Sequence, residues 1–169
     1  MNPARDQLLA GLKEAILTEQ TGIQFYTVAA GNTTDPKGRE VFRQLAGEEA
    51  EHLQWLRRQY GHLVEGTPWE AWTPAPHADL SGPSPIFSDG LLSRIGEAHW
   101  EMTALAVGLA LEEATVIRYR KLAQAADEPA AKRFLEELAK WEESHAAALS
   151  RQSSLLKESY WREARFAPF

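Results

Sequence analysis

The sequence contains no cysteine. This absence excludes disulfide bonds, cysteine-ligated zinc or iron–sulfur sites, and thiol catalysis. No apolar run approaches the roughly 18 residues that a membrane span requires, and the first residues lack the basic-then-apolar layout of a secretory signal. Basic residues are in deficit, with 18 Lys and Arg against 24 Asp and Glu, which is unusual for a nucleic-acid-binding protein. We therefore expect a cytoplasmic protein with neither a membrane nor a nucleic acid as partner.

Helical periodicity is the strongest pattern that the sequence does contain. Apolar residues recur at steps of three and four in four long segments, which predicts four helices. Two of them begin at an acidic residue followed by proline, at Asp35-Pro36 and Glu128-Pro129, a combination typical of helix starts. Beyond residue 156, a tail with four aromatic residues among charges predicts a short C-terminal helix over part of 157–169.

A proline-rich segment divides the four helices into two pairs. Residues 61–90 hold five of the nine prolines, so no helix is expected there. The segment is too long for a tight turn but long enough to run the length of a helical bundle. We expect helical hairpins over about 4–61 and 89–156, joined end to end by a crossover over 61–88. This arrangement is the ferritin-like form of an all-α four-helix bundle, here occupying residues 1–169 as one domain.

The two hairpins are copies of one pattern. At an offset of 93 residues, Leu12 aligns with Leu105 and Pro36 aligns with Pro129 without any gap. The chemically important matches at the same offset are Glu19 with Glu112, Tyr26 with Tyr119, Glu49 with Glu142, and His52 with His145. The sequence therefore predicts one helical hairpin used twice, related by a pseudo-two-fold axis.

Six polar residues interrupt the apolar stripes of these helices. Each hairpin contributes one Glu from its first helix and a Glu-x-x-His pair from its second, and residues three apart share one helical face. Four buried carboxylates cannot stay charged and unpaired, and two divalent cations would balance them. A Glu from each of two helices plus a Glu-x-x-His from each of the other two is the di-iron or di-manganese carboxylate pattern. The six residues are Glu19, Glu49, His52, Glu112, Glu142 and His145.

The evidence for this site comes from several features occurring together, not from any one motif. A single Glu-x-x-His is weak, because chance alone produces such pairs. Here both pairs fall on core stripes, and all six residues obey one repeat. The alternative interpretation, two solvated helix faces with coincidental Glu and His, does not account for that agreement. Oxygen-rich ligation with one imidazole per metal suits iron or manganese better than structural zinc.

Four segments resemble a known family. The stretches LTEQTGIQFYTVAA, FRQLAGEEAEHLQWL, LEEATVIRYRKLA and FLEELAKWEESHAAAL are similar to the rubrerythrin-like branch of the ferritin-like superfamily. The resemblance covers about residues 8–60 and 86–150. It implies two iron ions, with manganese, mixed iron and manganese, or zinc as alternatives, held by the six residues above. It also implies that Glu49 and Glu142 bridge the two metals.

Two departures from the family pattern bear on the activity. Full rubrerythrins carry a cysteine-ligated rubredoxin iron site that passes electrons to the di-iron centre, so a chain without cysteine requires an external donor such as a rubredoxin-like protein or a reductase. Rubrerythrins also tend to carry a further carboxylate three residues after the ligand of the third helix. That position is Thr115, and its repeat partner is Gly22.

Several neighbours of the six residues have two interpretations. Tyr26 and Tyr119 follow Glu19 and Glu112 by two turns, so each phenol either donates a hydrogen bond to a ligand carboxylate or is an ordinary core tyrosine. Trp55 and Trp141 flank the Glu-x-x-His pairs, where packing is a simpler role than electron relay. The remaining nearby acids are interpreted as solvated neighbours of the ligands: Glu48, Glu51, Glu113 and Glu143.

The sequence supports two functions of different kinds. The leading hypothesis is a di-iron oxidoreductase that reduces hydrogen peroxide, or reacts with dioxygen, using electrons from an external donor. The alternative is an iron-binding protein of iron homeostasis that oxidises Fe(II) without an organic substrate. A purely structural helical protein is disfavoured, because it would have no use for four buried carboxylates. We also expect a homodimer.

Overall fold

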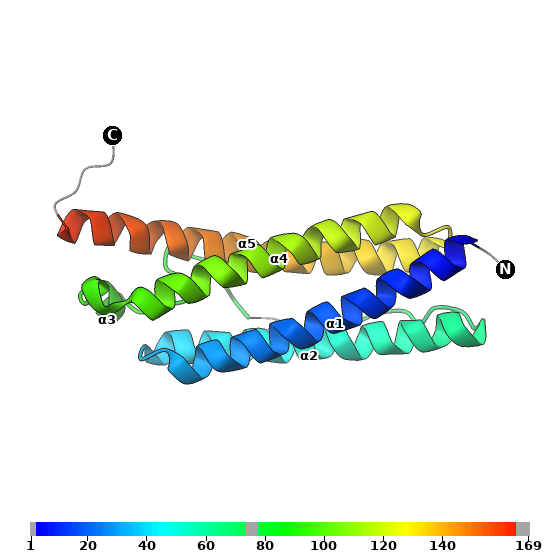
Figure 1. The fold of residues 1–169 in the computed structure, drawn as a ribbon, viewed down its shortest axis with the longest axis horizontal. Helices are drawn as coiled ribbons and strands as arrows, with labels where there is room; N and C mark the ends of the chain where they lie inside the picture. Colours follow the sequence, from blue (N-terminus) through cyan, green and yellow to red (C-terminus); the bar gives the residue numbers. More distant parts are fainter. Residues whose placement is uncertain (1–2, 74–77, 165–169) are drawn as a thin grey trace.

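The computed structural model describes residues 3–73 and 78–164, and its architecture is a bundle of long helices (Figure 1). The four long elements are α1 (Pro3–Asn32), α2 (Pro36–Glu65), α4 (His99–Ala125) and α5 (Pro129–Glu163). A short α3 (Asp89–Leu92) and the 3-10 turn η1 (Ile95–Glu97) precede α4. The described residues contain no strand, so the predicted all-α class is confirmed.

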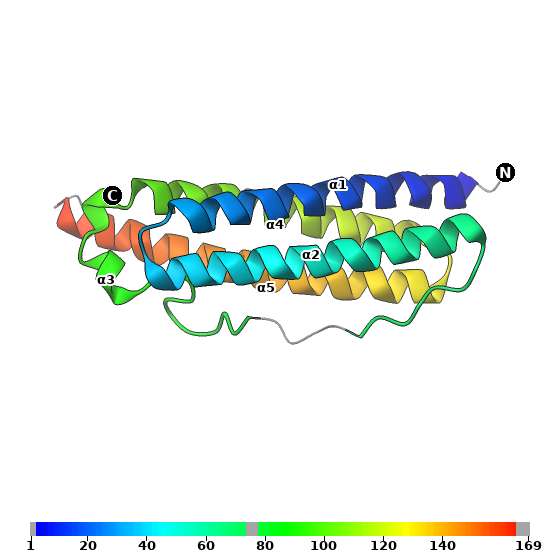
Figure 2. The ribbon, with the colours of Figure 1, turned by 90° about the horizontal axis from the view of Figure 1, so that it is seen from below.

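The long helices form two hairpins, with α1 packed on α2 and α4 packed on α5. The two hairpins lie alongside one another over the length of the molecule (Figures 1 and 2). The described parts of residues 66–88 run beside α2 and α5 from one end of the bundle to the other (Figure 2). This path is the end-to-end crossover expected from its length. Within the described residues, no helix combines the length and the apolar character needed to cross a membrane.

Three helix boundaries differ from those expected. Helix α2 continues past Gly61 and ends at Gly66, whose φ of 73° is the left-handed conformation that glycine adopts at helix ends. Helix α4 begins at His99 instead of residue 89, because α3 and η1 occupy the preceding residues. Residues 157–163 extend α5 instead of forming a separate helix, and residues 165–169 of the expected tail lie outside the described residues.

The two acidic-residue–proline helix starts are not equivalent. Asp35 Oδ1 accepts a hydrogen bond of 2.8 Å from the backbone N–H of Gly38, which caps α2. Glu128 occupies the corresponding position of α5 but makes no side-chain capping bond. The expectation of matching caps therefore holds for α2 alone. Proline in the first turn is common to both helices.

Two apolar layers fill the bundle on either side of its middle. One contains fully buried Phe42, Leu45 and Leu105, and the other contains fully buried Leu12 and Leu135. Burying side chains of this size stabilises the fold by about 1.5–3 kcal/mol each. The six Glu and His residues singled out by the repeat are buried between these layers, so the packed helices fix their positions.

Two glutamines at the repeat offset hold the crossover against the bundle. Gln59 exchanges two hydrogen bonds with the backbone of Glu70, its Nε2 donating at 2.7 Å and its Oε1 accepting at 3.1 Å. Gln152 Oε1 accepts from the backbone N–H groups of Ile86 and Phe87, both at 2.9 Å. Both side chains are fully buried. The repeat therefore positions the two ends of the crossover as well as the helices.

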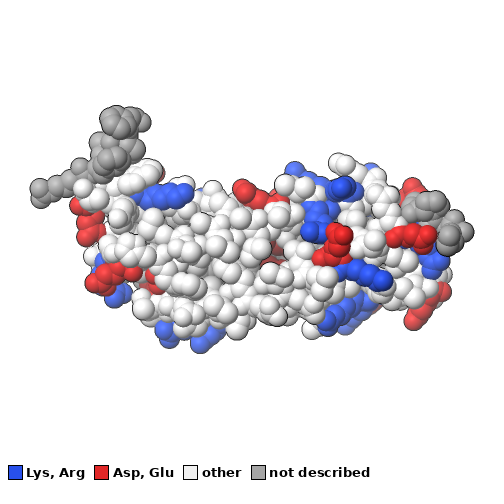
Figure 3. Space-filling view, viewed as in Figure 1, with Lys and Arg blue, Asp and Glu red and all other residues white. Residues whose placement is uncertain are grey.

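The outer face formed by α1 and α4 carries exposed apolar side chains. Leu17, Val28, Val107 and Ile117 are each between 43% and 68% exposed. Residues other than Lys, Arg, Asp and Glu cover much of the left and central part of this face, while charged residues gather right of its centre and toward the ends (Figure 3). Large contiguous apolar patches mark contact surfaces, whereas apolar side chains exposed singly are common.

Candidate metal centre

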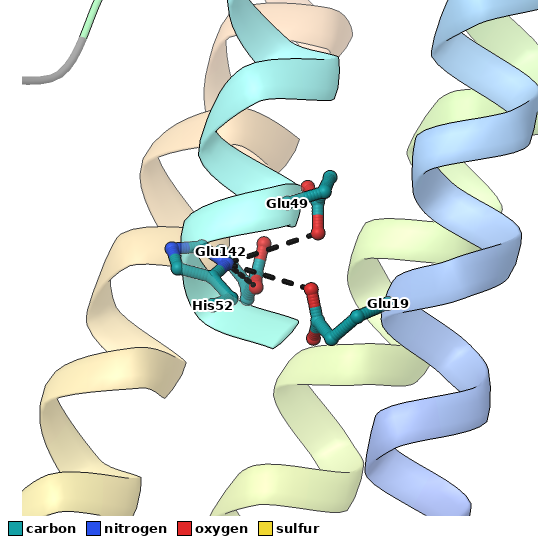
Figure 4. Close-up of side chains that lie close together, drawn as sticks. All are labelled: Glu19, Glu49, His52 and Glu142. Atoms are coloured by element: carbon teal, nitrogen blue, oxygen red, sulfur yellow. Dashed lines mark ion pairs between the residues drawn. The ribbon is translucent and has the colours of Figure 1, made fainter. Parts of the chain in front are cut away.

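All four long helices contribute to one polar cluster in the middle of the bundle. Helix α1 supplies Glu19 and α4 supplies Glu112, while α2 and α5 each supply a Glu-x-x-His pair. Each of the six residues is at most 3% exposed. Figure 4 shows the half that contains His52, with three carboxylates converging on its imidazole from α1, α2 and α5. The structure therefore brings together all six residues that the sequence singled out.

The cluster consists of two overlapping groups that can each hold a cation. In each group, one ligand atom per residue lies within 4.8 Å of all the others. Glu19 and His52 belong to the first group, Glu112 and His145 belong to the second, and both groups contain Glu49 and Glu142. The two shared carboxylates therefore lie between the two positions, where bridging ligands would be placed.

The two imidazoles approach the shared carboxylates through the same ring atom. His52 Nδ1 lies 2.9 Å from Glu142 Oε1, and His145 Nδ1 lies 3.3 Å from Glu142 Oε2. Glu49 is similarly divided, with Oε2 at 3.7 Å from His52 Nδ1 and Oε1 at 3.6 Å from His145 Nδ1. Each shared carboxylate thus offers one oxygen to each half of the cluster.

The unsatisfied atoms of the cluster fit a pair of metal ions. Buried polar groups are normally hydrogen-bonded, yet several ligand atoms have no hydrogen-bond partner among the described residues. Six of the unpartnered atoms lie on the inner side of the two candidate groups: Glu19 Oε2, Glu49 Oε1, both Glu142 oxygens, His52 Nδ1 and His145 Nδ1. Carboxylate oxygens and neutral imidazole nitrogens are the donor set that iron and manganese accept.

The four carboxyl groups of the cluster do not share one charge state. Burial, followed by the negative charge of Glu49, raises the pKa of Glu19 well above its ordinary value. Burial and the charges of Glu142 and Glu49 likewise raise the pKa of Glu112. Burial alone would also raise the pKa values of the shared pair. Close contacts with Glu19 and the two histidines lower the pKa of Glu49, and the positive charge of His52 lowers that of Glu142. Without a metal, bound protons therefore neutralise part of the negative charge that metal cations would otherwise balance.

The histidines respond in the opposite sense. Burial alone would lower the pKa of His52, but the negative charge of Glu142 and contacts with Glu19 and Glu49 raise it well above its ordinary value. The pKa of His145 is raised in the same way, against the effect of burial, by Glu142, Glu48 and Glu49. Metal ions must displace these protons before the imidazoles can act as ligands.

Two tyrosines connect the hairpins through hydrogen bonds to the unshared carboxylates. Tyr26 on α1 donates to Glu112 Oε1 on α4, and Tyr119 on α4 donates to Glu19 Oε1 on α1. Burial, together with the neighbouring carboxylate charge, raises the pKa of each phenol, so each keeps the proton that it donates. Each tyrosine therefore orients the carboxylate of the opposite hairpin.

Glu48 is not the solvated neighbour that the sequence suggested. Its side chain is buried, and Oε2 lies 2.8 Å from His145 Nε2 and accepts a 2.8 Å hydrogen bond from Trp141 Nε1. Its Oε1 accepts a 2.6 Å hydrogen bond from the backbone N–H of Ala78. Helical periodicity on α2 alone could not reveal partners on α5 and in the crossover. The repeat offered a signal, because position 48 aligns with Trp141, and a tryptophan at the equivalent position indicates a buried rather than a solvated side chain.

The other neighbours differ in their surroundings. Trp141 is buried with its ring centroid 4.9 Å from that of His52, and Trp72 of the crossover stacks on it at 5.5 Å. Trp55 is partly buried against one apolar layer, and the Arg58 guanidinium lies 4.9 Å from its ring centroid. Among the neighbouring acids, Glu113 is exposed, and half-buried Glu143 pairs with Arg120. Glu51 is half-buried.

The two positions that follow the unshared glutamates by three residues carry no carboxylate. The Thr115 hydroxyl donates a 3.0 Å hydrogen bond to the backbone carbonyl of Leu111. Gly22 faces the cluster, where an added Cβ would lie 3.3 Å from Glu49 Cγ and 3.4 Å from Glu49 Oε2. The absence of a side chain at Gly22 therefore leaves room for a shared carboxylate.

We expect Gly22→Ala to separate stability from metal binding. Alanine in the interior of α1 should raise the unfolding free energy of the metal-free protein by about 0.5–1 kcal/mol. Its methyl group should displace the Glu49 carboxylate and weaken metal binding roughly tenfold, the lower end of the cost of disturbing a ligand's support. Denaturant unfolding and metal titration of the same preparation measure the two effects.

Gly47→Ala is the matched control for this prediction. Gly47 is exposed in the interior of α2, and an added Cβ there meets no described atom within 4 Å. It should gain similar stability with unchanged metal affinity. Equal metal affinities for the Gly22 and Gly47 variants would contradict the contact inferred between position 22 and Glu49.

Comparison with known proteins points to the same kind of site. The sequence matches the rubrerythrin family over residues 11–153. A solved structure of a hypothetical protein from Pyrococcus furiosus is similar, with a TM-score of 0.60 and 26% sequence identity, over 89% of this chain and 90% of that one. No protein with curated annotation matches. The family and the buried carboxylate–histidine cluster together indicate a di-metal site. Because the matched segment covers most of the chain and contains the whole cluster, the protein belongs to the rubrerythrin family.

Proposed function

We propose that the protein is a di-iron oxidoreductase that reduces hydrogen peroxide with electrons from an external donor. The observation that carries this proposal is the pair of overlapping carboxylate–histidine groups, which share Glu49 and Glu142 and come from a single chain. Six side chains leave each of two metals with open coordination positions, which a small oxygen-containing substrate requires. The proposed ligands are Glu19, Glu49, His52, Glu112, Glu142 and His145, with Glu49 and Glu142 bridging.

The donor chemistry suits iron or manganese, and we propose iron as the resident metal because the chain resembles di-iron proteins. Each position has one imidazole and otherwise carboxylate oxygens, a set that suits iron and manganese. Manganese alone, mixed iron and manganese, or zinc in purified material are the alternatives. A bound iron pair would supply the reducing electrons to the substrate.

Reduction of one hydrogen peroxide to two waters consumes two electrons and two protons. In this reaction the side chains around the ligands have two tasks, which are to orient the carboxylates and to exclude bulk water. Tyr26 and Tyr119 retain their phenolic protons and hold Glu112 and Glu19 in place, so the unshared carboxylates stay oriented through the reaction. The packed apolar layers on both sides of the cluster exclude bulk water from it.

A second candidate function is oxidation of Fe(II) for iron homeostasis, without an organic substrate. Thr115 favours it, because rubrerythrins that reduce peroxide tend to carry a carboxylate at this position. The Thr115 hydroxyl is used in a hydrogen bond to Leu111 within its own helix. The two candidates predict different preferences for the oxidant and different fates for added Fe(II).

Stopped-flow oxidation of the reduced, iron-loaded protein distinguishes the two functions. We expect hydrogen peroxide to oxidise the iron pair faster than dioxygen does, and turnover to continue when a reductant is supplied. Glu142→Ala should show neither reaction, because it lacks a shared carboxylate. Glu113→Gln is the matched control beside Glu112, since Glu113 is exposed, and it should behave as the unmodified protein.

The opposite kinetic preference would replace this proposal with the second candidate. If dioxygen reacts faster and added Fe(II) is oxidised over many turnovers, the protein is a ferroxidase. Loading with manganese in place of iron provides a further check. Ferroxidase turnover requires a site that Fe(II) can enter, so a site filled with manganese should oxidise less of the added Fe(II).

The partners follow from the same proposal. The electron donor would be a rubredoxin-like protein or a reductase. The exposed apolar side chains of α1 and α4 support a homodimer through that face (Figure 3). A solution molar mass equal to that of one 18.9 kDa chain would contradict the dimer. The cytoplasmic location expected from the sequence stays a prediction.

A further inference from the structure

The two halves of the cluster differ at the outward-facing nitrogens of their histidines. Both rings direct Nδ1 toward the shared carboxylates. The other nitrogen of His145 lies 2.8 Å from Glu48 Oε2. The other nitrogen of His52 has no hydrogen-bond partner within the described part of the chain, although it is fully buried. The two halves of the cluster are therefore alike at the shared carboxylates but differ at the outer nitrogens of their histidines.

This difference arises from one pair of aligned positions. Residue 48 precedes the shared glutamate of α2, and residue 141 precedes the shared glutamate of α5. The first is glutamate and the second is tryptophan, so His145 receives a carboxylate and His52 receives an indole. The Trp141 ring contacts His52 edge-on, with the ring centroids 4.9 Å apart, and Trp72 approaches the same imidazole at 6.3 Å.

Glu48 is held in place from three directions. In addition to His145, it accepts hydrogen bonds from Trp141 Nε1 at 2.8 Å and from the backbone N–H of Ala78 at 2.6 Å. The donors come from α5 and from the crossover, so Glu48 on α2 joins three segments of the chain. A carboxylate with this many partners has a fixed orientation, and it fixes the imidazole that it contacts.

We propose that Glu48 is a positioning residue that makes the two metal positions unequal, with the His145 position binding metal more tightly than the His52 position. A carboxylate that accepts the outer N–H of a ligating imidazole fixes its tautomer and raises its basicity, and losing such a partner typically costs about 10–100-fold in metal affinity. When His52 binds a metal through Nδ1, its other nitrogen carries a buried proton that no described acceptor receives.

The inequality has a consequence for metal exchange. The His145 position would fill first and empty last, while the His52 position, bordered by the tryptophans, would be the one at which a metal enters and leaves. This inference rests on the proposed di-metal site but not on the identity of the reaction.

Single-position variants test the inequality without interference between the two metals. Glu19→Ala removes a side chain specific to the His52 position, and Glu112→Ala removes one specific to the His145 position. Titration of each metal-free variant with cobalt(II), followed by visible absorption, gives the affinity and the ligand-field spectrum of the remaining position. We expect Glu19→Ala to bind one cobalt(II) at least about tenfold more tightly than Glu112→Ala does.

Adding Glu48→Gln to each variant tests the assigned cause. The affinity should fall about 10–100-fold in the Glu19→Ala background, with a shifted visible spectrum, and stay unchanged in the Glu112→Ala background. Restoring a carboxylate with Glu48→Asp should recover part of the loss. Glu113→Gln in both backgrounds is the control for a general effect of charge.

The outcomes separate this inference from the proposed function. Equal affinities of the two single-position variants, or equal losses on adding Glu48→Gln, would overturn the inequality and leave the di-metal site in place. If the unmodified protein binds no cobalt(II), both the inequality and the proposed function fail. Peroxide kinetics do not enter this test, so a ferroxidase would give the same titrations as a peroxidase.

Discussion

Replacing Glu142 by alanine should remove both metal ions from the protein. Glu142 Oε1 lies 2.9 Å from His52 Nδ1 and Oε2 lies 3.3 Å from His145 Nδ1, so this one carboxylate serves both positions. Losing a shared ligand should cost more than losing a partner of a ligand, so we expect affinity to fall by more than about 100-fold at each position. Anaerobic Fe(II) titration with elemental analysis after desalting measures the loss.

Glu49→Ala should have a matched effect, because Glu49 belongs to both groups as well. Glu19→Ala should remove a single metal, and Glu113→Ala, at an exposed position on α4, should remove none. Far-UV circular dichroism confirms that each variant is helical before the metal is counted. If Glu142→Ala retains one metal at its original affinity, Glu142 is a ligand of one position only and the shared arrangement is wrong.

Metal binding and alkaline pH should act on stability in opposite directions. The folded metal-free protein holds protons on Glu19, Glu112 and both histidines above their ordinary pKa values of 4.5 and 6.5. Between the ordinary and the raised pKa, the folded state binds more protons than the unfolded state, so the unfolding free energy falls as pH rises. Each such group contributes up to about 1.4 kcal/mol per pH unit in that range.

The lowered pKa values of Glu49 and Glu142 act at the acid end. Their contribution to stability is present above about pH 4.5 and is lost as pH falls below that value. The metal-free protein should therefore be most stable near pH 5 and should weaken steadily toward pH 8. Metal ions replace the held protons, so their affinity rises over the same range.

Thermal unfolding of the metal-free and metal-loaded protein at several pH values measures both trends. With free metal at about 1,000 times the dissociation constant, one bound ion adds about 4 kcal/mol, which raises the Tm by roughly 8–16 °C for a chain of this size. Gly47→Ala, which is remote from the cluster in its contacts, should show the same pH trend as the unmodified protein. An unchanged Tm on chelation, or metal-free stability that rises toward pH 8, would contradict the buried charge arrangement.

The sequence was most informative where the spacing of residues within one helix shows which side chains face inward. The step of three from Glu49 to His52 and from Glu142 to His145 sets the faces that turn inward, and the 93-residue repeat aligns the two halves. The structure places those side chains in one cluster with Glu19 and Glu112. The crossover was also predictable, because its proline content excludes helix and its length spans the bundle.

The sequence was least informative where the signal depends on contacts between helices. Glu48 lies beside the inward face of α2, and only its partners on α5 and in the crossover distinguish it from a solvated residue. The extended end of α5 is similar, because residues 157–163 continue a helix that the aromatic tail suggested would be interrupted. Gly66 rather than Gly61 ends α2, since the left-handed conformation at residue 66 depends on the chain that follows.

Anomalous X-ray diffraction from crystals of iron-loaded protein, recorded at the iron absorption edge, locates the metal ions directly. We predict two iron peaks about 3.5–4 Å apart, the usual separation in two-metal sites. One peak should lie beside His52 Nδ1 and the other beside His145 Nδ1, with Glu49 and Glu142 between them. A single peak, no peak, or iron bound away from these residues would contradict the predicted di-metal site.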